Sequence, residues 1–145
     1  MARILVTGMS GAGKSTLLAE LARRGHCTVD TDHDNWTLPD GLWDEARMGD
    51  LLTHHDDLIV SGTVENQGRF YPRFDHVVLL SAPLDVLLER VATRTGNPYG
   101  RAPHERAEIR RHTAEVEPLL RGGADVELDG CRPVTELADS IEGLD

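Results

Sequence analysis

Short apolar runs alternate with longer amphipathic or polar segments along the whole chain. Each run is too short for a typical helix and ends next to glycine, hydroxyl or acidic residues, which is typical of a buried strand. The runs predict strands at Arg3–Thr7, Cys27–Asp30, Leu58–Ser61, Val77–Ser81 and Val126–Leu128.

The segments between these runs favour helices. In the first of them, Leu17, Leu18 and Leu21 lie on one face, and Gly25 follows as a stop signal. These segments predict helices at Lys14–Arg24, Leu42–Leu52, Pro83–Thr93, Pro103–Arg121 and Pro133–Ile141.

Two segments have weaker patterns. Val64–Phe74 fits a short helix or an ordered loop equally well, whereas Thr95–Arg101 is dense in turn-forming residues and predicts a mobile loop. Strands that alternate with helices predict a parallel sheet covered on both faces. One α/β domain accounts for residues 1–145, with no internal repeat, low-complexity run or linker.

The chain of 145 residues has a formal net charge of -10, which fits a contribution to solubility and opposes nucleic acid or anionic membrane partners. Cys27 and Cys131 match no zinc spacing and fit free thiols in a reducing cytosol, although a disulfide between them stays open. The N-terminal residues MARILVTGMS lack the apolar core of a signal peptide, and no stretch is long enough for a membrane span. We therefore expect a cytoplasmic protein, of an oligomeric state that the sequence does not indicate.

The strongest local signal follows the first predicted strand. It matches G-x-x-x-x-G-K-[ST], a phosphate-binding loop whose glycines let successive backbone N–H groups point at an anion held at a helix N-terminus. Lys14 is expected to reach the β- and γ-phosphates of ATP, and Ser15 to offer its hydroxyl to Mg²⁺. The predicted nucleotide-binding residues of this loop are Gly8, Ser10, Gly11, Ala12, Gly13, Lys14, Ser15 and Thr16.

The loop sequence GMSGAGKST, the VDTD of the second strand and the LERVATR before a glycine-proline loop resemble the small P-loop kinases. This group includes shikimate kinase, gluconate kinase and nucleoside monophosphate kinase-like enzymes, and the resemblance covers nearly the whole chain. It implies the P-loop NTPase fold, a five-stranded parallel sheet flanked by helices, with a substrate-binding segment at 31–56 and a short lid at 93–103. The implied activity is transfer of the γ-phosphate of ATP to a small molecule: a nucleoside monophosphate, a nucleoside or a hydroxylated metabolite.

Acidic residues end the second predicted strand, where an open parallel sheet binds its ligands. Two carboxylates there can hold Mg²⁺ and orient or deprotonate a substrate hydroxyl, although a helix cap or a solvated turn would use the same residues. The resemblance gives Asp30 the metal role and Asp32 the substrate role. It also places Gly62 close to the substrate, at a position where motor ATPases usually carry an acid.

Arginines of the predicted lid can stabilise the charge that phosphoryl transfer develops. Arg90 and Arg94 share a helix face, and Arg101 closes the loop after them, although a solvated basic face would look the same. The resemblance implies that Arg90 packs on the base and that Arg94 and Arg101 meet the phosphates. It also assigns Arg132 and Pro133 to an adenine-binding loop, which reads equally as an ordinary turn before a helix.

The acceptor is expected to bind among residues 33–70. Arg47 and Arg69 are the basic candidates for an anionic acceptor, and Asn66 and Gln67 could bind a base or a sugar. The two tryptophans of this region fit a stack on the acceptor ring and a place in the core equally well.

Two other classes of function compete with a small-molecule kinase. A nucleotide-binding switch that hydrolyses ATP slowly and acts with a partner protein would need the same loop, but the lid arginines and the Asp-x-Asp sequence favour the kinase. A polynucleotide 5′-kinase is opposed by the net charge of -10 and by the absence of a basic stretch.

Overall fold

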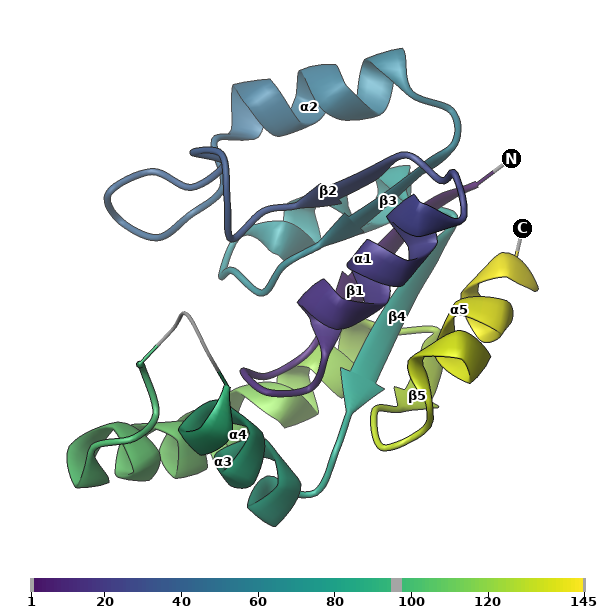
Figure 1. The fold of residues 1–145 in the computed structure, drawn as a ribbon. Coiled ribbons are helices and arrows are strands. Elements are labelled where there is room, and N and C mark those ends of the chain that lie inside the picture. The colour runs from purple at the N-terminus through teal and green to yellow at the C-terminus, as the bar shows by residue number, and fades with distance from the viewer. Residues whose placement is uncertain (1, 95–97, 145) are drawn as a thin grey trace.

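The structure, a computed structural model, describes residues 2–94 and 98–144. Its described strands form one sheet in the order β2-β3-β1-β4-β5, and every pairing is parallel (Figure 1). The strands are β1 (Arg3–Thr7), β2 (Thr28–Asp30), β3 (Leu58–Ser61), β4 (His76–Ser81) and β5 (Val126–Asp129). The predicted P-loop NTPase architecture is confirmed, and the strand ends differ from the prediction by at most one residue.

Among the described residues, five helical segments connect the strands and a sixth follows the last strand. They are α1 (Lys14–Arg23), α2 (Glu45–His54), the 3-10 helix η1 (Gln67–Arg73), α3 (Leu84–Thr93), α4 (Pro103–Gly123) and α5 (Val134–Glu142). None of the helices within residues 2–94 and 98–144 is both long and apolar enough for a membrane crossing.

The helix boundaries show what local chemistry added to the hydrophobic pattern. The helix predicted from Leu42 begins at Glu45 instead, because Asp44 caps it by accepting a hydrogen bond from the Arg47 backbone N–H. The ambiguous segment Val64–Phe74 contains η1, in which Pro72 has a place because a short 3-10 helix needs fewer backbone donors. Residues 95–97 of the predicted loop and lid lie outside the described residues.

The sheet is covered on both faces by two separate apolar clusters. Along β1, Ile4 and Val6 pack with α1 and α5 on one face, while Leu5 packs with α2 and η1 on the other. Trp43 lies in this second cluster, fully buried, and its indole N–H donates to the Thr31 hydroxyl at 3.0 Å. Trp36 is buried in the same cluster, so both tryptophans serve the core rather than an acceptor ring.

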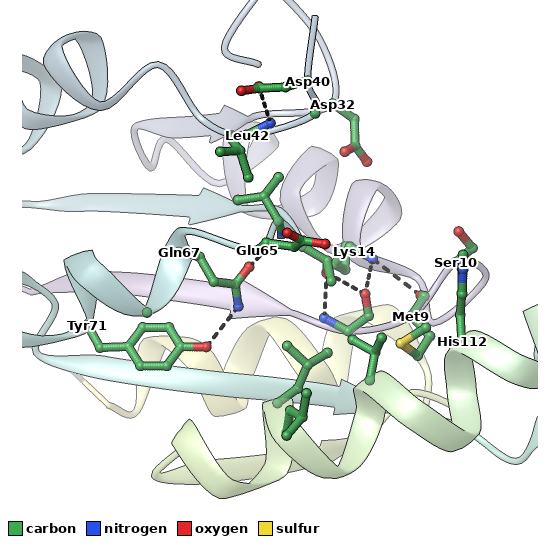
Figure 2. Close-up of a pocket in the computed structure, with 18 residues that line it drawn as sticks. Met9, Ser10, Lys14, Asp32, Asp40, Leu42, Glu65, Gln67, Tyr71 and His112 are labelled. Carbon is green, nitrogen blue, oxygen red and sulfur yellow. Dashed lines mark hydrogen bonds between the residues drawn. The ribbon is translucent and has the colours of Figure 1, made fainter. Parts of the chain in front are cut away.

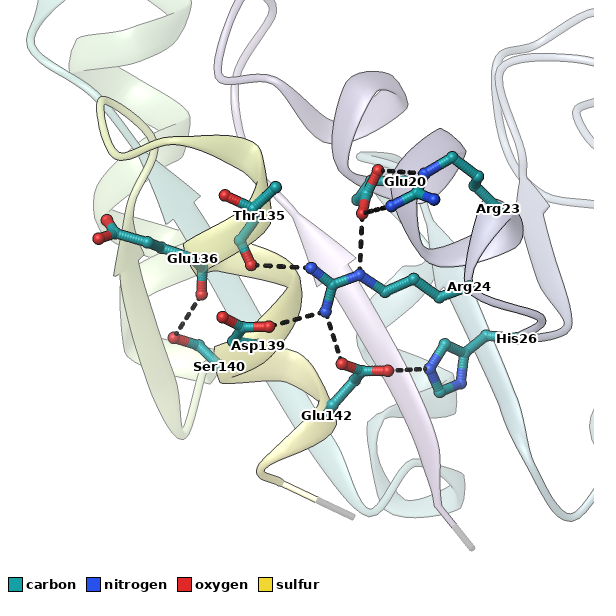
Figure 3. Close-up of polar contacts among 9 residues, drawn as sticks. All are labelled: Glu20, Arg23, Arg24, His26, Thr135, Glu136, Asp139, Ser140 and Glu142. Carbon is teal, nitrogen blue, oxygen red and sulfur yellow. Dashed lines mark hydrogen bonds and ion pairs between the residues drawn. The ribbon is translucent and has the colours of Figure 1, made fainter.

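A polar clasp joins α1 to α5 across the other face (Figure 3). The Arg24 guanidinium donates to Glu20 at 2.8 Å on its own helix, and to Asp139 at 2.8 Å and Glu142 at 2.6 Å on α5. Glu142 also bonds His26 at 2.7 Å. The clasp fixes the C-terminal helix beside the helix that carries the phosphate-binding loop.

Candidate active site

The segment between β1 and α1 is shaped to bind phosphate. Gly11 and Gly13 have φ angles of +89° and +104°, which side-chain-bearing residues rarely adopt. Gly13 is the N-cap of α1 and provides no side-chain cap, and the first turn of α1 contains no acidic residue. The first backbone N–H groups of α1 therefore lack an intrahelical partner and face a position that favours an anion.

Lys14 lies over this loop, where its ammonium donates hydrogen bonds to the carbonyls of Gly8 and Met9. The pKa of Lys14 lies below its ordinary value, mainly because burial disfavours the charged ammonium. The negative charges of Asp32 and Asp30 oppose this shift, and the positive charge of Arg94 adds to it. The ammonium thus lies in a field set by the same carboxylates and arginine that were predicted to share its site.

Thr63 holds the start of the loop, a role that the sequence analysis missed. Its hydroxyl donates to the Gly8 carbonyl at 2.6 Å, accepts from the Gly8 N–H at 3.2 Å and lies 3.0 Å from the Thr7 hydroxyl. The available signal was a hydroxyl residue just after β3, at the carboxyl edge of the sheet. That signal is weak, because the contact joins residues 55 positions apart.

The two residues predicted to bind Mg²⁺ lie in direct contact. The Ser15 hydroxyl donates to the Asp30 carboxylate at 2.6 Å, and the other Asp30 oxygen accepts from the Asp32 N–H at 3.1 Å. Within the described residues, no group of three or more His, Cys, Asp or Glu side chains is arranged for a metal. This donor set fits Mg²⁺, which keeps several waters and binds through one or two protein oxygens plus substrate phosphates.

A cavity of about 890 Å³ extends from the phosphate-binding loop to the lid. Arg94 lines it from the end of α3, and its Nη2 donates to the Tyr99 carbonyl at 3.1 Å. The Nε of Arg94 is buried and has no hydrogen-bond partner among residues 2–94 and 98–144. Arg101 is exposed, bonds the Arg94 carbonyl and does not line this cavity.

A smaller cavity of about 280 Å³ adjoins the loop on the side of α5. Arg90, Gly130 and Arg132 line it, whereas Pro133 serves as the N-cap of α5 and does not. The Arg90 guanidinium donates to the carbonyls of Gly11, Ala12 and Gly130, so it ties the phosphate-binding loop to the loop after β5. This position is compatible with the predicted stacking on a base.

A third cavity, of about 820 Å³, is also lined by Lys14 (Figure 2). We call it the acceptor cavity; four segments line it: the phosphate-binding loop, residues of 32–42, residues of 63–71, and the second half of α4. Lys14 and Asp32 line both this cavity and the large one on the lid side. Asp32 is exposed, and its carboxylate has no hydrogen-bond partner within the described part of the chain.

The predicted acceptor-binding residues are mostly engaged elsewhere. The Arg47 guanidinium donates to the carbonyls of Asp34 and Asn35, lies 3.9 Å from the centre of the Trp36 ring and does not line the acceptor cavity. Arg69 is exposed, lies 3.5 Å from Glu45 and does not line the cavity either. The structure therefore does not bring these two arginines to the acceptor side.

Gly62 and Gln67 have structural partners. A Cβ on Gly62 would clash with the Thr31 hydroxyl and approach the Trp43 ring within 3.2 Å, so glycine is required there by packing. Gln67 does line the acceptor cavity, but its amide already bonds Thr7, Tyr71 and the Val64 N–H. It shapes the wall more than it offers free polar groups.

Comparison with known proteins gives the relatives of this chain. No family model matches it. A curated protein, the shikimate kinase of Aromatoleum aromaticum, is 31% identical to this chain in an alignment 150 residues long. The alignment covers 89% of this chain and 85% of that protein.

Solved structures agree in fold. The shikimate kinase of Acinetobacter baumannii in complex with shikimate superposes with a TM-score of 0.74 at 22% identity and covers 99% of this chain and 92% of that one. A gluconokinase of Sinorhizobium meliloti 1021 gives a TM-score of 0.67 at 21% identity, over 98% of this chain and 90% of that one. With these relatives and this phosphate-binding loop, the chain belongs to the shikimate kinase family of small P-loop kinases.

Proposed function

We propose that this kinase transfers the γ-phosphate of ATP, bound with Mg²⁺, to a hydroxyl group of a small molecule in the acceptor cavity. One observation carries the proposal: Lys14 and Asp32 line both the acceptor cavity and the cavity that leads to the lid. A phosphoryl group held by Lys14 would thus lie between a nucleotide on one side and an acceptor on the other.

The reaction needs one proton transfer and one displacement. The Asp32 carboxylate accepts the proton of the acceptor hydroxyl, the oxygen forms a bond to the γ-phosphorus, and the bond from that phosphorus to the bridging oxygen of ADP breaks. Lys14 and the guanidinium of Arg94 donate to the phosphoryl oxygens, where negative charge is concentrated. Mg²⁺ held by Ser15 and Asp30 would neutralise further phosphate charge.

The reaction is tested by ADP release from purified protein with Mg²⁺, alone and with a panel of nucleosides, nucleoside monophosphates, shikimate, gluconate and aminoglycosides. Wild type runs beside Lys14→Ala and Asp32→Asn. Asp34→Asn is the matched control, because Asp34 is exposed, does not line the acceptor cavity, and asparagine tolerates its positive φ of 61°.

We expect one acceptor to stimulate turnover at least roughly tenfold, and both active-site variants to lose that stimulation while Asp34→Asn keeps it. ATP hydrolysis that no acceptor stimulates, and that Asp32→Asn leaves unchanged, would instead favour a nucleotide-dependent switch acting with a partner protein.

A further inference from the structure

The charges around the acceptor cavity are strongly unequal. Its lining contains the carboxylates of Asp32, Asp40 and Glu65, but among the described residues its only lysine or arginine is Lys14, the single lysine of the chain (Figure 2). His112 of α4 also lines the cavity and is the other side chain there that can carry a positive charge. The cavity is therefore acidic on the side away from the nucleotide.

These carboxylates are available to a ligand. Asp32, Asp40 and Glu65 are exposed, and within residues 2–94 and 98–144 none of them forms an ion pair. Asp40 accepts one hydrogen bond, from the Leu42 N–H at 3.0 Å, which leaves its second oxygen free. These unpaired carboxylates would repel an anionic ligand. Such repulsion is one way in which a site discriminates against the wrong ligand.

Lys14 is expected to serve the nucleotide rather than the acceptor. Lys14 contacts the carbonyls of the phosphate-binding loop and is the residue expected to hold the phosphates of the nucleotide. Bound nucleotide would add further negative charge beside Asp32. With nucleotide in place, the acceptor side thus favours a cation even more than the protein does alone.

The remaining wall of the cavity is partly apolar. Val116 and Leu119 of α4 line it, and Leu119 is 73% exposed, an unusual position for so large an apolar side chain. The Tyr71 hydroxyl accepts a hydrogen bond from Gln67 and keeps its own proton to donate, and Tyr71 lines the same cavity. A ring with one apolar face and several hydroxyl groups would fit these apolar and polar groups.

We propose that the acceptor is a hydroxylated ring compound that carries a protonated amine and no carboxylate or phosphate. Its amine would pair with Asp40 and Glu65, its reacting hydroxyl would face Asp32, and its apolar face would lie on Leu119. The inference rests on the proposed function, because it takes this cavity as the acceptor site. Shikimate, bound in the Acinetobacter baumannii structure, is a carboxylate and would not suit this lining.

A matched series of six-membered carbocycles tests the charge preference directly: 2-deoxystreptamine (cationic), myo-inositol (neutral) and shikimate (anionic). Binding is measured by calorimetry with Mg²⁺ and a non-hydrolysable ATP analogue. We expect 2-deoxystreptamine to bind at least roughly tenfold more tightly than myo-inositol, shikimate to bind worst, and the preference to shrink as ionic strength rises. Equal or tighter binding of the neutral or anionic ring, or no binding of 2-deoxystreptamine at millimolar concentration, overturns the proposal.

Two variants test which carboxylates cause the preference for an amine, and a third variant is the control. Glu65→Gln and Asp40→Asn should each weaken amine binding by roughly fivefold and leave myo-inositol unchanged. Glu115→Gln is the control, because Glu115 is an exposed residue of α4 that does not line the cavity. An unchanged amine preference in both cavity variants would contradict the proposed contacts.

The readout needs no turnover, so it separates the two claims. Amine binding without transfer would support the charge preference and refute the kinase reaction. Transfer to a neutral or anionic acceptor alone would support the reaction and refute the charge preference.

Discussion

The nucleotide side and the acceptor side of the molecule share Lys14 and Asp32, yet they are built in different ways. On the nucleotide side, one continuous segment from β1 into α1 provides the phosphate-binding loop and also Ser15, which donates to Asp30 at 2.6 Å. On the acceptor side, four segments that are separated in the sequence line the cavity, and their side chains contact one another as well as the cavity. Binding groups on the first side can be identified from local sequence, whereas on the second they depend on tertiary contacts.

The largest effect should follow from removing the one residue that both sides use as a cation. Lys14→Ala is expected to lower ATP turnover by roughly 10²–10³-fold, because a preorganised positive charge at the transferred phosphoryl group is lost. Thermal unfolding should stay close to wild type, since Lys14 is a site residue and not part of either core cluster. Turnover within threefold of wild type would break the account of the nucleotide side.

A smaller effect is expected at the metal pair. Ser15→Ala removes the hydroxyl that lies 2.6 Å from Asp30, and should raise the Mg²⁺ concentration for half-maximal turnover by roughly tenfold to a hundredfold. Titration of the rate with Mg²⁺ measures this shift. Ser140→Ala, at a half-buried position of α5, provides a serine control outside the site. A Mg²⁺ requirement that Ser15→Ala leaves unchanged would remove Ser15 from the metal site.

On the acceptor side, a substitution of Gly62 distinguishes a role in core packing from a role in acceptor binding. Gly62→Ala should lower the free energy of unfolding by roughly 1–3 kcal/mol, because its Cβ would meet Thr31 and Trp43 in a filled core. Gly122→Ala is the control, since nothing lies within 4 Å of a Cβ there and Gly122 does not line the acceptor cavity. Urea unfolding compares the two. If Gly62→Ala is as stable as wild type but binds acceptor poorly, the implied place beside the substrate is correct and the packing argument is wrong.

Substitutions of Arg47 and Arg69 test the same distinction between stability and acceptor binding, with smaller expected losses of stability. Arg47→Ala should cost about 1 kcal/mol of stability, because it removes hydrogen bonds to two carbonyls and the contact with Trp36. Arg69→Ala should cost less than roughly 0.5 kcal/mol, since its contact with Glu45 is exposed. Loss of acceptor binding in either variant, with stability preserved, would support the prediction that these arginines bind an anionic acceptor.

The smallest effect concerns the clasp between α1 and α5. Hydrogen bonds from Arg23, then Arg24, lower the pKa of Glu20 from 4.5 to about 2. A carboxyl whose pKa is lower in the folded state adds stability above its unfolded pKa and loses it as pH falls. The stability difference between wild type and Glu20→Gln, followed by urea unfolding, should be constant above about pH 5 and vanish as the pH falls toward 2. A difference that does not change with pH would exclude Glu20 as the titrating group.

The extent of sequence-based prediction follows the same division. The β1 and β3 bounds and the α1 start were predicted to the residue, because buried apolar runs and the glycine loop are local signals. Ser15 and Asp30, which the motif and the resemblance assign to the metal, lie in contact, and their metal roles stay a prediction. The engagement of Arg47 by two backbone carbonyls, and the hold of Thr63 on Gly8, could not be predicted, since both depend on how distant segments pack.

The central claim is that Asp32 acts on the acceptor and not on the nucleotide. The most direct test measures both quantities on Asp32→Asn: the affinity for ATP with Mg²⁺, and the rate at which labelled γ-phosphate reaches the acceptor. We predict an affinity within about twofold of wild type and transfer slowed by roughly 10²–10⁴-fold, the usual contribution of a general base. Transfer at the wild-type rate, or a loss of ATP affinity that accounts for the slower transfer, would contradict it.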